Sequence, residues 1–247
     1  MQILTVIISL SIFILNYSNC FSQKDQSDSD SELEQAVFYQ IFPAILDSIH
    51  SDFRLIPPPP PSPDYLRKRG YDVDNKESPY TTAYEDWKKS QDFKMRNREW
   101  EKKRDSIERD TTSIYLTIPD SIGRTEEDDI LKLVEHFAEH NISADSFIAS
   151  NPFQIDILKL KTHQSKVRFI YQSKLPGDGK FWRNDYGKYI AASMSFTKII
   201  FDKSKSFGVL NAGYVKGTLD GYGVRIFIKK NENGEWQIDE VKGTWIS

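Results

Sequence analysis

The C-terminal part of the chain consists of a series of alternating apolar runs, and this series constrains the fold more than any other feature. Four strand-like runs cover residues 191–201, 206–217, 221–230 and 235–247. Short turn segments separate them, and the last turn contains Asn233-Gly234, a pair that tolerates the positive φ angles of a tight hairpin. Because consecutive strands joined by short turns pair antiparallel, we expect a four-stranded antiparallel meander here.

Two shorter strand patterns and a helical pattern precede the meander. Residues 113–119 and 166–173 have the composition and alternation of short strands. Residues 32–50 carry apolar side chains at helical spacing, and Pro43 is expected to kink or split that helix. We therefore expect an α+β fold, with N-terminal helices and a C-terminal antiparallel β-meander forming a curved sheet.

The segment between these patterns is dominated by prolines and then by charges. Residues 57–61 are five consecutive prolines, a composition that forms a stiff polyproline II rod. A spacer is the favoured interpretation, and a ligand for an aromatic-lined groove of a partner is the alternative. Residues 83–110 interleave acidic and basic side chains, which favours a solvated helix over a nucleic-acid-binding arm.

These patterns together predict the domain organisation of the chain. We expect a signal peptide over residues 1–22, a disordered linker over 23–31, a helical region over 32–110 with a proline-rich spacer at 57–63, and an α+β domain over 111–247.

The N-terminus has the features of an export signal. Residues 3–15 form an uncharged apolar run that is short for a membrane span but suits the core of a signal peptide. Cleavage after Ser22 places Cys20 and Ser22 at the positions where small residues are required. A short membrane anchor is the alternative. We therefore expect an extracytoplasmic protein, either secreted or periplasmic.

Cys20 is the only cysteine of the chain. If it is removed with the signal peptide, the mature protein has no disulfide, no thiolate nucleophile and no cysteine-ligated metal. The alternative is an acylated Cys20, which would make the protein a membrane-anchored lipoprotein adaptor. The preceding Tyr17, Ser18 and Asn19 match a lipoprotein signal poorly, so simple secretion is favoured.

His136, Glu139 and His140 form an H-x-x-E-H pattern, the inverted zinc-binding order of one metalloprotease group. A catalytic zinc needs a third protein ligand besides two imidazoles on one helix face, with a glutamate as general base. The residues that follow His140 do not resemble those of such peptidases. A zinc-dependent hydrolase is therefore an alternative function and not the favoured one.

Residues 128–140 are expected to form a helix, and a helical wheel places the pattern relative to the core. At about 100° per residue, Ile130, Val134 and Phe137 share the apolar face, the two histidines lie on its flank, and Glu139 points away from the core. We expect these three apolar residues to pack in the core. His136 and His140 should then be replaceable with little loss of stability.

Composition and motifs exclude several other activities. A net charge of −3 argues against a nucleic-acid binder that relies on summed positive charge. The chain contains neither a G-x-S-x-G pattern nor a P-loop. A glycosidase is not excluded in this way, because its two catalytic carboxylates are paired in space and their pairing cannot be read from the sequence. We therefore expect a non-enzymatic binding or envelope-associated domain without catalytic, cofactor-binding or metal-binding residues. The sequence does not identify a partner: no nucleic acid is expected, and an envelope component or another protein is the candidate.

A set of glycines and aromatic residues marks the C-terminal block. Its members are Gly208, Gly213, Gly217, Gly221, Gly223, Gly234, Trp236, Trp245 and Ser247. This block resembles the tails of uncharacterised exported proteins from Bacteroidetes-type bacteria. The resemblance implies a secreted protein and no known activity. The layout is also similar to NTF2-like or cystatin-like sheets, an analogy that carries no function.

Overall fold

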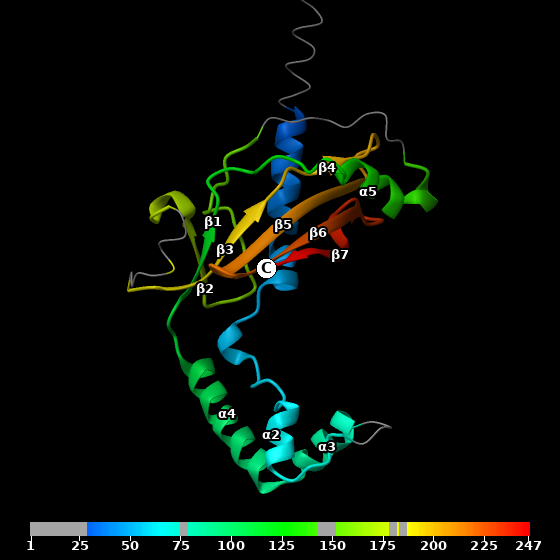
Figure 1. Ribbon diagram of the computed structural model, residues 1–247. Coiled ribbons are helices and arrows are strands. Elements are labelled where there is room, and N and C mark those ends of the chain that lie inside the picture. The colour runs from blue at the N-terminus through cyan, green and yellow to red at the C-terminus, as the bar shows by residue number, and fades with distance from the viewer. Residues whose placement is uncertain (1–28, 75–78, 143–151, 178–181, 183–186) are drawn as a thin grey trace, which may run out of the picture. The chain divides into compact units, whose positions relative to one another are not determined.

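The computed structural model describes residues 29–74, 79–142, 152–177, 182 and 187–247. The chain divides into two compact units, shown in Figure 1: a sheet unit from residues 1–50 and 113–247, and a helical unit from residues 51–112. The expected signal peptide over residues 1–22 lies outside the described residues. Within the described ranges, no helix has both the length and the apolar character needed to cross a bilayer.

The sheet unit is built on an open, seven-stranded mixed sheet. Its strands are β1 (Ile114–Ile118), β2 (Val167–Tyr171), β3 (Tyr189–Phe196), β4 (Ile200–Phe201), β5 (Phe207–Gly217), β6 (Asp220–Lys230) and β7 (Trp236–Ile246). Their order is β2-β1-β3-β5-β6-β7, and the short β4 pairs with β5. The pairs β3–β5, β5–β6 and β6–β7 are antiparallel, which confirms the α+β class and the meander.

Strand β1 lies between β2 and β3 and runs parallel to both. The sequence indicated β1 and β2 as strands, but it did not indicate how they pair. Parallel neighbours require a long crossover connection. Helix α5 (Asp129–His136) lies in the connection between β1 and β2 and makes it long enough.

The first helix runs without interruption over residues 29–49, so the split expected at Pro43 does not occur. Residues 29–31, expected in a disordered linker, belong to this helix. Its buried apolar side chains are Val37, Phe38, Ile41, Phe42, Ile45, Leu46 and Ile49. The ring of Phe38 lies 5.2 Å from that of Phe196 on β3. Packing of this kind holds the helix together although Pro43 lacks an N–H for the helical ladder.

This first helix belongs to the sheet unit and not to the helical region expected over residues 32–110. The ring of Phe42 contacts that of Phe169 on β2, with centroids 5.4 Å apart. At the other end of the helix, the Tyr222 hydroxyl of β6 donates a hydrogen bond to the carbonyl of Ile49. Helical spacing shows that an apolar stripe exists, but it does not show which distant strands cover the stripe.

The first helix and α5 lie on opposite faces of the sheet (Figure 1). Side chains alternate between faces along a strand, and β6 shows this directly. Tyr222 contacts the first helix, whereas Arg225 and Phe227 contact the α5 segment. The α5 face of the sheet therefore carries a buried charged side chain, that of Arg225.

Helix α5 is shorter than the helix expected over residues 128–140, and it turns a different face to the sheet. It ends at His136, and a 3-10 turn over Ala138–His140 follows. Leu133 and Phe137 are buried, but Ile130 is 38% exposed, so its assignment to the core was wrong. The buried face also contains the polar Asp129, which a wheel based on apolar residues cannot identify.

In its described residues, the helical unit contains a 3-10 turn and three α-helices. These are η1 (Phe53–Leu55), α2 (Pro63–Lys68), α3 (Pro79–Lys88) and α4 (Gln91–Arg109). The charged segment expected as one helix over residues 83–110 is divided because Ser90 begins a new helix: its side chain accepts the N–H of Phe93 at 3.1 Å. The buried core residues of this unit are Leu66, Val73, Ala83 and Trp87.

Candidate functional site

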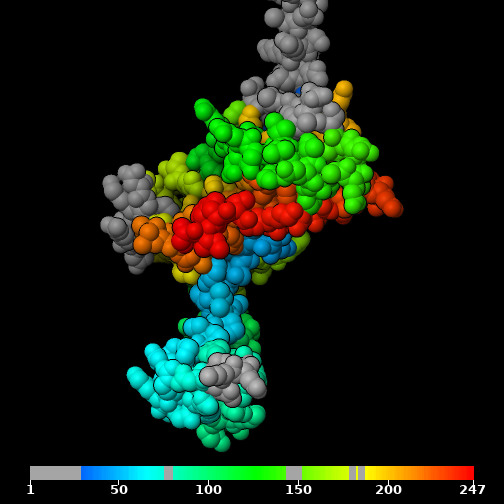
Figure 2. Space-filling view, turned by 45° about the vertical axis from the view of Figure 1, so that its right-hand side comes forward, coloured from blue at the N-terminus to red at the C-terminus, as the bar shows by residue number. Residues whose placement is uncertain are grey.

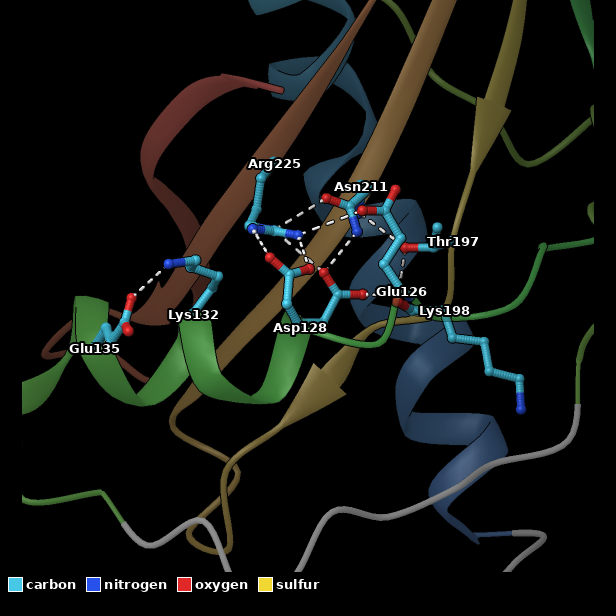
Figure 3. A network of polar contacts seen from close by, with 9 residues as sticks. Glu126, Asp128, Lys132, Glu135, Thr197, Lys198, Asn211 and Arg225 are labelled. Atoms are coloured by element: carbon cyan, nitrogen blue, oxygen red, sulfur yellow. Dashed lines mark hydrogen bonds and ion pairs between the residues drawn. The ribbon is translucent and has the colours of Figure 1, made fainter. Parts of the chain in front are cut away.

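Arg225 on β6 joins the start of α5 to the sheet through a network of ion pairs (Figure 3). Its Nε lies 3.2 Å from Asp129 Oδ1, and its Nη2 lies 2.6 Å from Asp128 Oδ1. Asp129 is completely buried and also accepts a hydrogen bond of 2.7 Å from Asn211 Nδ2 on β5. Because a buried carboxylate requires opposite charge and hydrogen bonds, the network fixes the position of α5.

The acidic side of this network has the spacing of a cation site. Oxygens of Glu126, Asp128 and Asp129 lie within 4.8 Å of one another. The Arg225 guanidinium contacts all three carboxylates, and its hydrogen bond to Asp128 holds the pKa of that carboxyl below its usual range. The guanidinium therefore supplies the positive charge that a metal would bring, and these residues form an ion-pair network.

Strand β7 carries two β-bulges where it passes α5. The β6–β7 register shifts twice, so that Thr244 and Asp239 are the extra residues of β7. A bulge changes the direction in which neighbouring side chains point. At the second bulge, Asp239 and its neighbour Glu240 both reach His136, with distances of 2.7 Å to Nε2 and 3.2 Å to Nδ1.

His136 is packed against the sheet and not on an exposed flank. Its ring is stacked on Phe227 of β6, with centroids 3.8 Å apart and planes 13° apart. Burial raises the pKa of Asp239, but the hydrogen bonds from Lys229 and His136 outweigh it and hold that pKa below the usual range. The expectation that His136 is replaceable with little loss of stability is therefore not supported by its contacts.

A pocket of about 330 Å³ lies between α5 and β7, which are neighbours on the surface in Figure 2. Its lining consists of Lys132, Glu135, His136, Arg225, Phe227, Lys242, Gly243 and Thr244. Three of these side chains are permanent cations and one is a carboxylate. The Phe227 ring adds an apolar surface, and the Lys242 ammonium lies 5.2 Å from its centroid.

The cations of this pocket differ in how firmly they are held. Lys132 pairs with Glu135 at 2.7 Å and Lys242 pairs with Glu240 at 2.9 Å, all with partly exposed side chains. Exposed ion pairs of this kind contribute about 0–1 kcal/mol, so an incoming anion can replace the carboxylates. Arg225 Nη1 makes one hydrogen bond to described residues, at 3.2 Å to Asp128, and has a second N–H to donate.

The H-x-x-E-H pattern does not form a ligand set in the described part of the chain. Because α5 ends at His136 and a 3-10 turn follows, His136 and His140 do not share one α-helical face. Glu139 is exposed, as the wheel indicated. The ring of His140 lies 4.8 Å from that of Phe207, whereas His136 faces the carboxylates of β7.

Sequence reasoning identified one residue of this pocket, His136, and assigned it a different environment. Lys132, Arg225 and Lys242 carried no motif. The available signal was Arg225 itself, an arginine between apolar residues of a strand and on the same face as Phe227. Such a residue requires buried acidic partners, but the sequence does not show which carboxylates provide them.

A scan against protein-family models, a search of curated proteins and a search of solved structures each found no match. The functional interpretation therefore rests on the geometry of the described residues.

Proposed function

We propose that the protein is an exported, non-enzymatic binding protein whose ligand is a small anion held between α5 and β7. The observation that carries this proposal is the charge of the pocket lining. The lining contains three cationic side chains, those of Lys132, Lys242 and Arg225, and one carboxylate, that of Glu135. The volume of about 330 Å³ is at the lower end of the range for small-molecule sites.

The arrangement suits a solute with two or more phosphate or carboxylate groups. One group would accept hydrogen bonds from the ammonium of Lys132, and another would accept them from the ammonium of Lys242. The free N–H of Arg225 lies at the network that anchors α5, so it provides a fixed donor. The Phe227 ring would contact the apolar part of the ligand.

The contacts of His136 favour a binding role for the pocket over a catalytic one. Among the lining side chains, His136 is the residue type most suited to general acid–base chemistry. Both of its nitrogens face carboxylates of β7, and its ring is stacked on Phe227. Proton transfer to a substrate would require His136 to leave these contacts.

Export is the second part of the proposal, and it rests on the N-terminal apolar run and on the resemblance to exported Bacteroidetes-type proteins. Mass spectrometry of the mature protein, after expression of the full chain in a secreting bacterial host, tests it. We expect an N-terminus at Gln23. An acylated Cys20 would show a lipoprotein instead, and an intact Met1 in the cytoplasm would contradict export.

Calorimetric titration of the mature protein with pyrophosphate and with citrate tests the ligand class. We expect saturable binding of at least one of them that weakens as salt is added, because salt screens the charges. The double variant Lys132→Gln/Lys242→Gln should lose affinity by about tenfold or more, since it removes two charge-assisted contacts. Lys203→Gln, an exposed lysine outside the lining, is the control. Binding by none of these proteins, or equal binding by all of them, would contradict the proposal.

A further inference from the structure

The five prolines of residues 57–61 lie along an aromatic surface of their own unit. Trp100 Nε1 donates a hydrogen bond of 3.3 Å to the carbonyl of Ile56, just before the run. The Tyr80 hydroxyl donates one of 2.9 Å to the carbonyl of Pro61, at its end. Aromatic side chains that contact a proline run and hydrogen-bond to its backbone are the features by which proteins bind polyproline II segments. The helical unit therefore already holds such a segment of its own.

A pocket of about 250 Å³ is present beside this proline run. Its lining residues are Pro57, Pro58, Pro59, Pro60, Tyr84, Trp87, Phe93, Arg96, Asn97 and Trp100. The lining thus combines proline rings with aromatic rings from α3 and α4. Both are flat apolar surfaces, so the pocket favours an extended apolar chain.

Arg96 is the only ionised side chain in this lining. Its guanidinium carbon lies 5.4 Å from the ring centroid of Tyr65 and 5.5 Å from that of Trp87. It makes no hydrogen bond or ion pair with any described residue. A guanidinium that lies over aromatic rings keeps its edge N–H groups for a planar acceptor such as a carboxylate.

The acidic residue nearest to these rings already has partners. Asp92 accepts hydrogen bonds from the Tyr65 hydroxyl at 2.6 Å and from Trp87 Nε1 at 2.9 Å. These hydrogen bonds, together with the ion pair to Arg69 at 3.6 Å and the charge of Arg96, hold the pKa of Asp92 below its usual range, and Asp92 makes no ion pair with Arg96. The pocket therefore offers a positive charge to a ligand.

We propose that this pocket binds an extended, proline-containing peptide segment that carries an acidic residue. A proline ring of the ligand packs in this pocket against its aromatic lining, Tyr84, Trp87 and Trp100. The neighbouring carboxylate of the ligand accepts a pair of hydrogen bonds from Arg96. The partner is thus another protein with an acidic, proline-containing segment, and this site is separate from the anion pocket of the sheet unit.

Titration of the mature protein with synthetic peptides tests this proposal, with the fluorescence of its tryptophans and calorimetry as readouts. Three peptides of equal length are compared: one with prolines flanked by glutamates, one with prolines flanked by lysines, and one with glycines flanked by glutamates. We expect saturable binding of the acidic proline peptide alone. This comparison uses the unmodified chain and does not depend on how any variant folds.

Variants then locate the binding site. We expect Arg96→Gln to weaken binding of the acidic proline peptide by about tenfold, the effect of losing one charge-assisted contact of about 1.4 kcal/mol. Arg98→Gln, an exposed arginine of α4 outside the lining, should leave it unchanged, and so should Lys132→Gln/Lys242→Gln. No binding at millimolar peptide, equal binding of the lysine peptide, or an Arg96→Gln variant that binds normally would overturn the proposal.

Discussion

Individual residues of the α5 face show how strongly the sheet unit depends on charges that are buried together. Asp129 is inaccessible to solvent, and the side chain of Arg225 is only 9% exposed. Arg225→Met should lower the free energy of unfolding by about 3–5 kcal/mol, because it leaves the Asp129 carboxylate buried without its cation. Urea denaturation measures this. Arg124→Met, at an exposed position, should change stability by no more than about 0.5 kcal/mol.

The two histidines of the H-x-x-E-H pattern should differ in their contribution to stability. His136→Ala should cost about 1–3 kcal/mol, since it removes both the stacking on Phe227 and the hydrogen bond to Asp239. His140→Ala should cost less than about 1 kcal/mol because His140 is exposed. Thermal denaturation of the two variants checks the order, and equal effects would contradict the assigned packing of His136.

For single residues, the sequence predicted which side chains are buried or exposed better than it predicted which side chains contact one another. Phe137 was correctly assigned to the core, and Glu139 was correctly assigned to the exposed face. Ile130 was assigned wrongly because the buried side of α5 is partly polar. The buried Asp129 carboxylate is stabilised by Arg225, which is distant in the sequence. The spacing of residues within one helix cannot predict such a contact.

Among the elements, the turn between β4 and β5 shows how a single carboxylate shapes a connection. Asp202 Oδ1 accepts the N–H groups of Ser206 at 2.8 Å and Phe207 at 2.9 Å, and Oδ2 accepts the N–H of Ser204 at 2.9 Å. Burial of Asp202 raises its pKa, but the hydrogen bond from the Ser204 hydroxyl at 2.6 Å and these backbone hydrogen bonds together outweigh it and hold the pKa below the usual range.

This lowered pKa predicts a pH dependence. Because the folded pKa of Asp202 lies below the unfolded value of about 3.9, its stabilising contribution is present above that value and is lost as pH falls through the folded pKa. Asp202→Asn should be less stable by about 1–3 kcal/mol at pH 7, and the difference should shrink below about pH 4. Urea denaturation at a series of pH values measures both. A difference that stays constant down to pH 3 would contradict this role.

The sequence predicted the strands of the sheet but not the β-bulges within them. The strand-like runs became strands because each carries apolar alternation and is bounded by turn residues, as at Asn233-Gly234. The run over residues 191–201 is divided into β3 and the short β4, so its prediction as one strand was wrong. The bulges at Asp239 and Thr244 were not predicted, because they depend on how β7 pairs with β6. Thr244 lines the pocket and Asp239 contacts His136, which also lines it, so the candidate site was less predictable than the fold.

At the scale of the whole molecule, the chain forms two compact units, each with its own core. The organisation was only partly predictable, because the first helix belongs with strands that follow the helical unit. Trp87, which is 4% exposed, is central to the core of the helical unit. Trp87→Ala should destabilise that unit by about 3–5 kcal/mol. Hydrogen exchange should then show lost protection in α3 and α4 and unchanged protection in β5 and β6; loss in both units would contradict their independence.

The proposed anion site is tested most directly by following backbone amide resonances of the mature protein while pyrophosphate is added. We expect saturable shifts at Gly243 and Thr244 of β7 and at Lys132, Glu135 and His136 of α5, because these residues line the pocket. The same titration of Lys132→Gln/Lys242→Gln should abolish or strongly weaken the shifts. Saturable shifts confined to other residues, or shifts that persist unchanged in the double variant, would contradict an anion-binding function for this pocket.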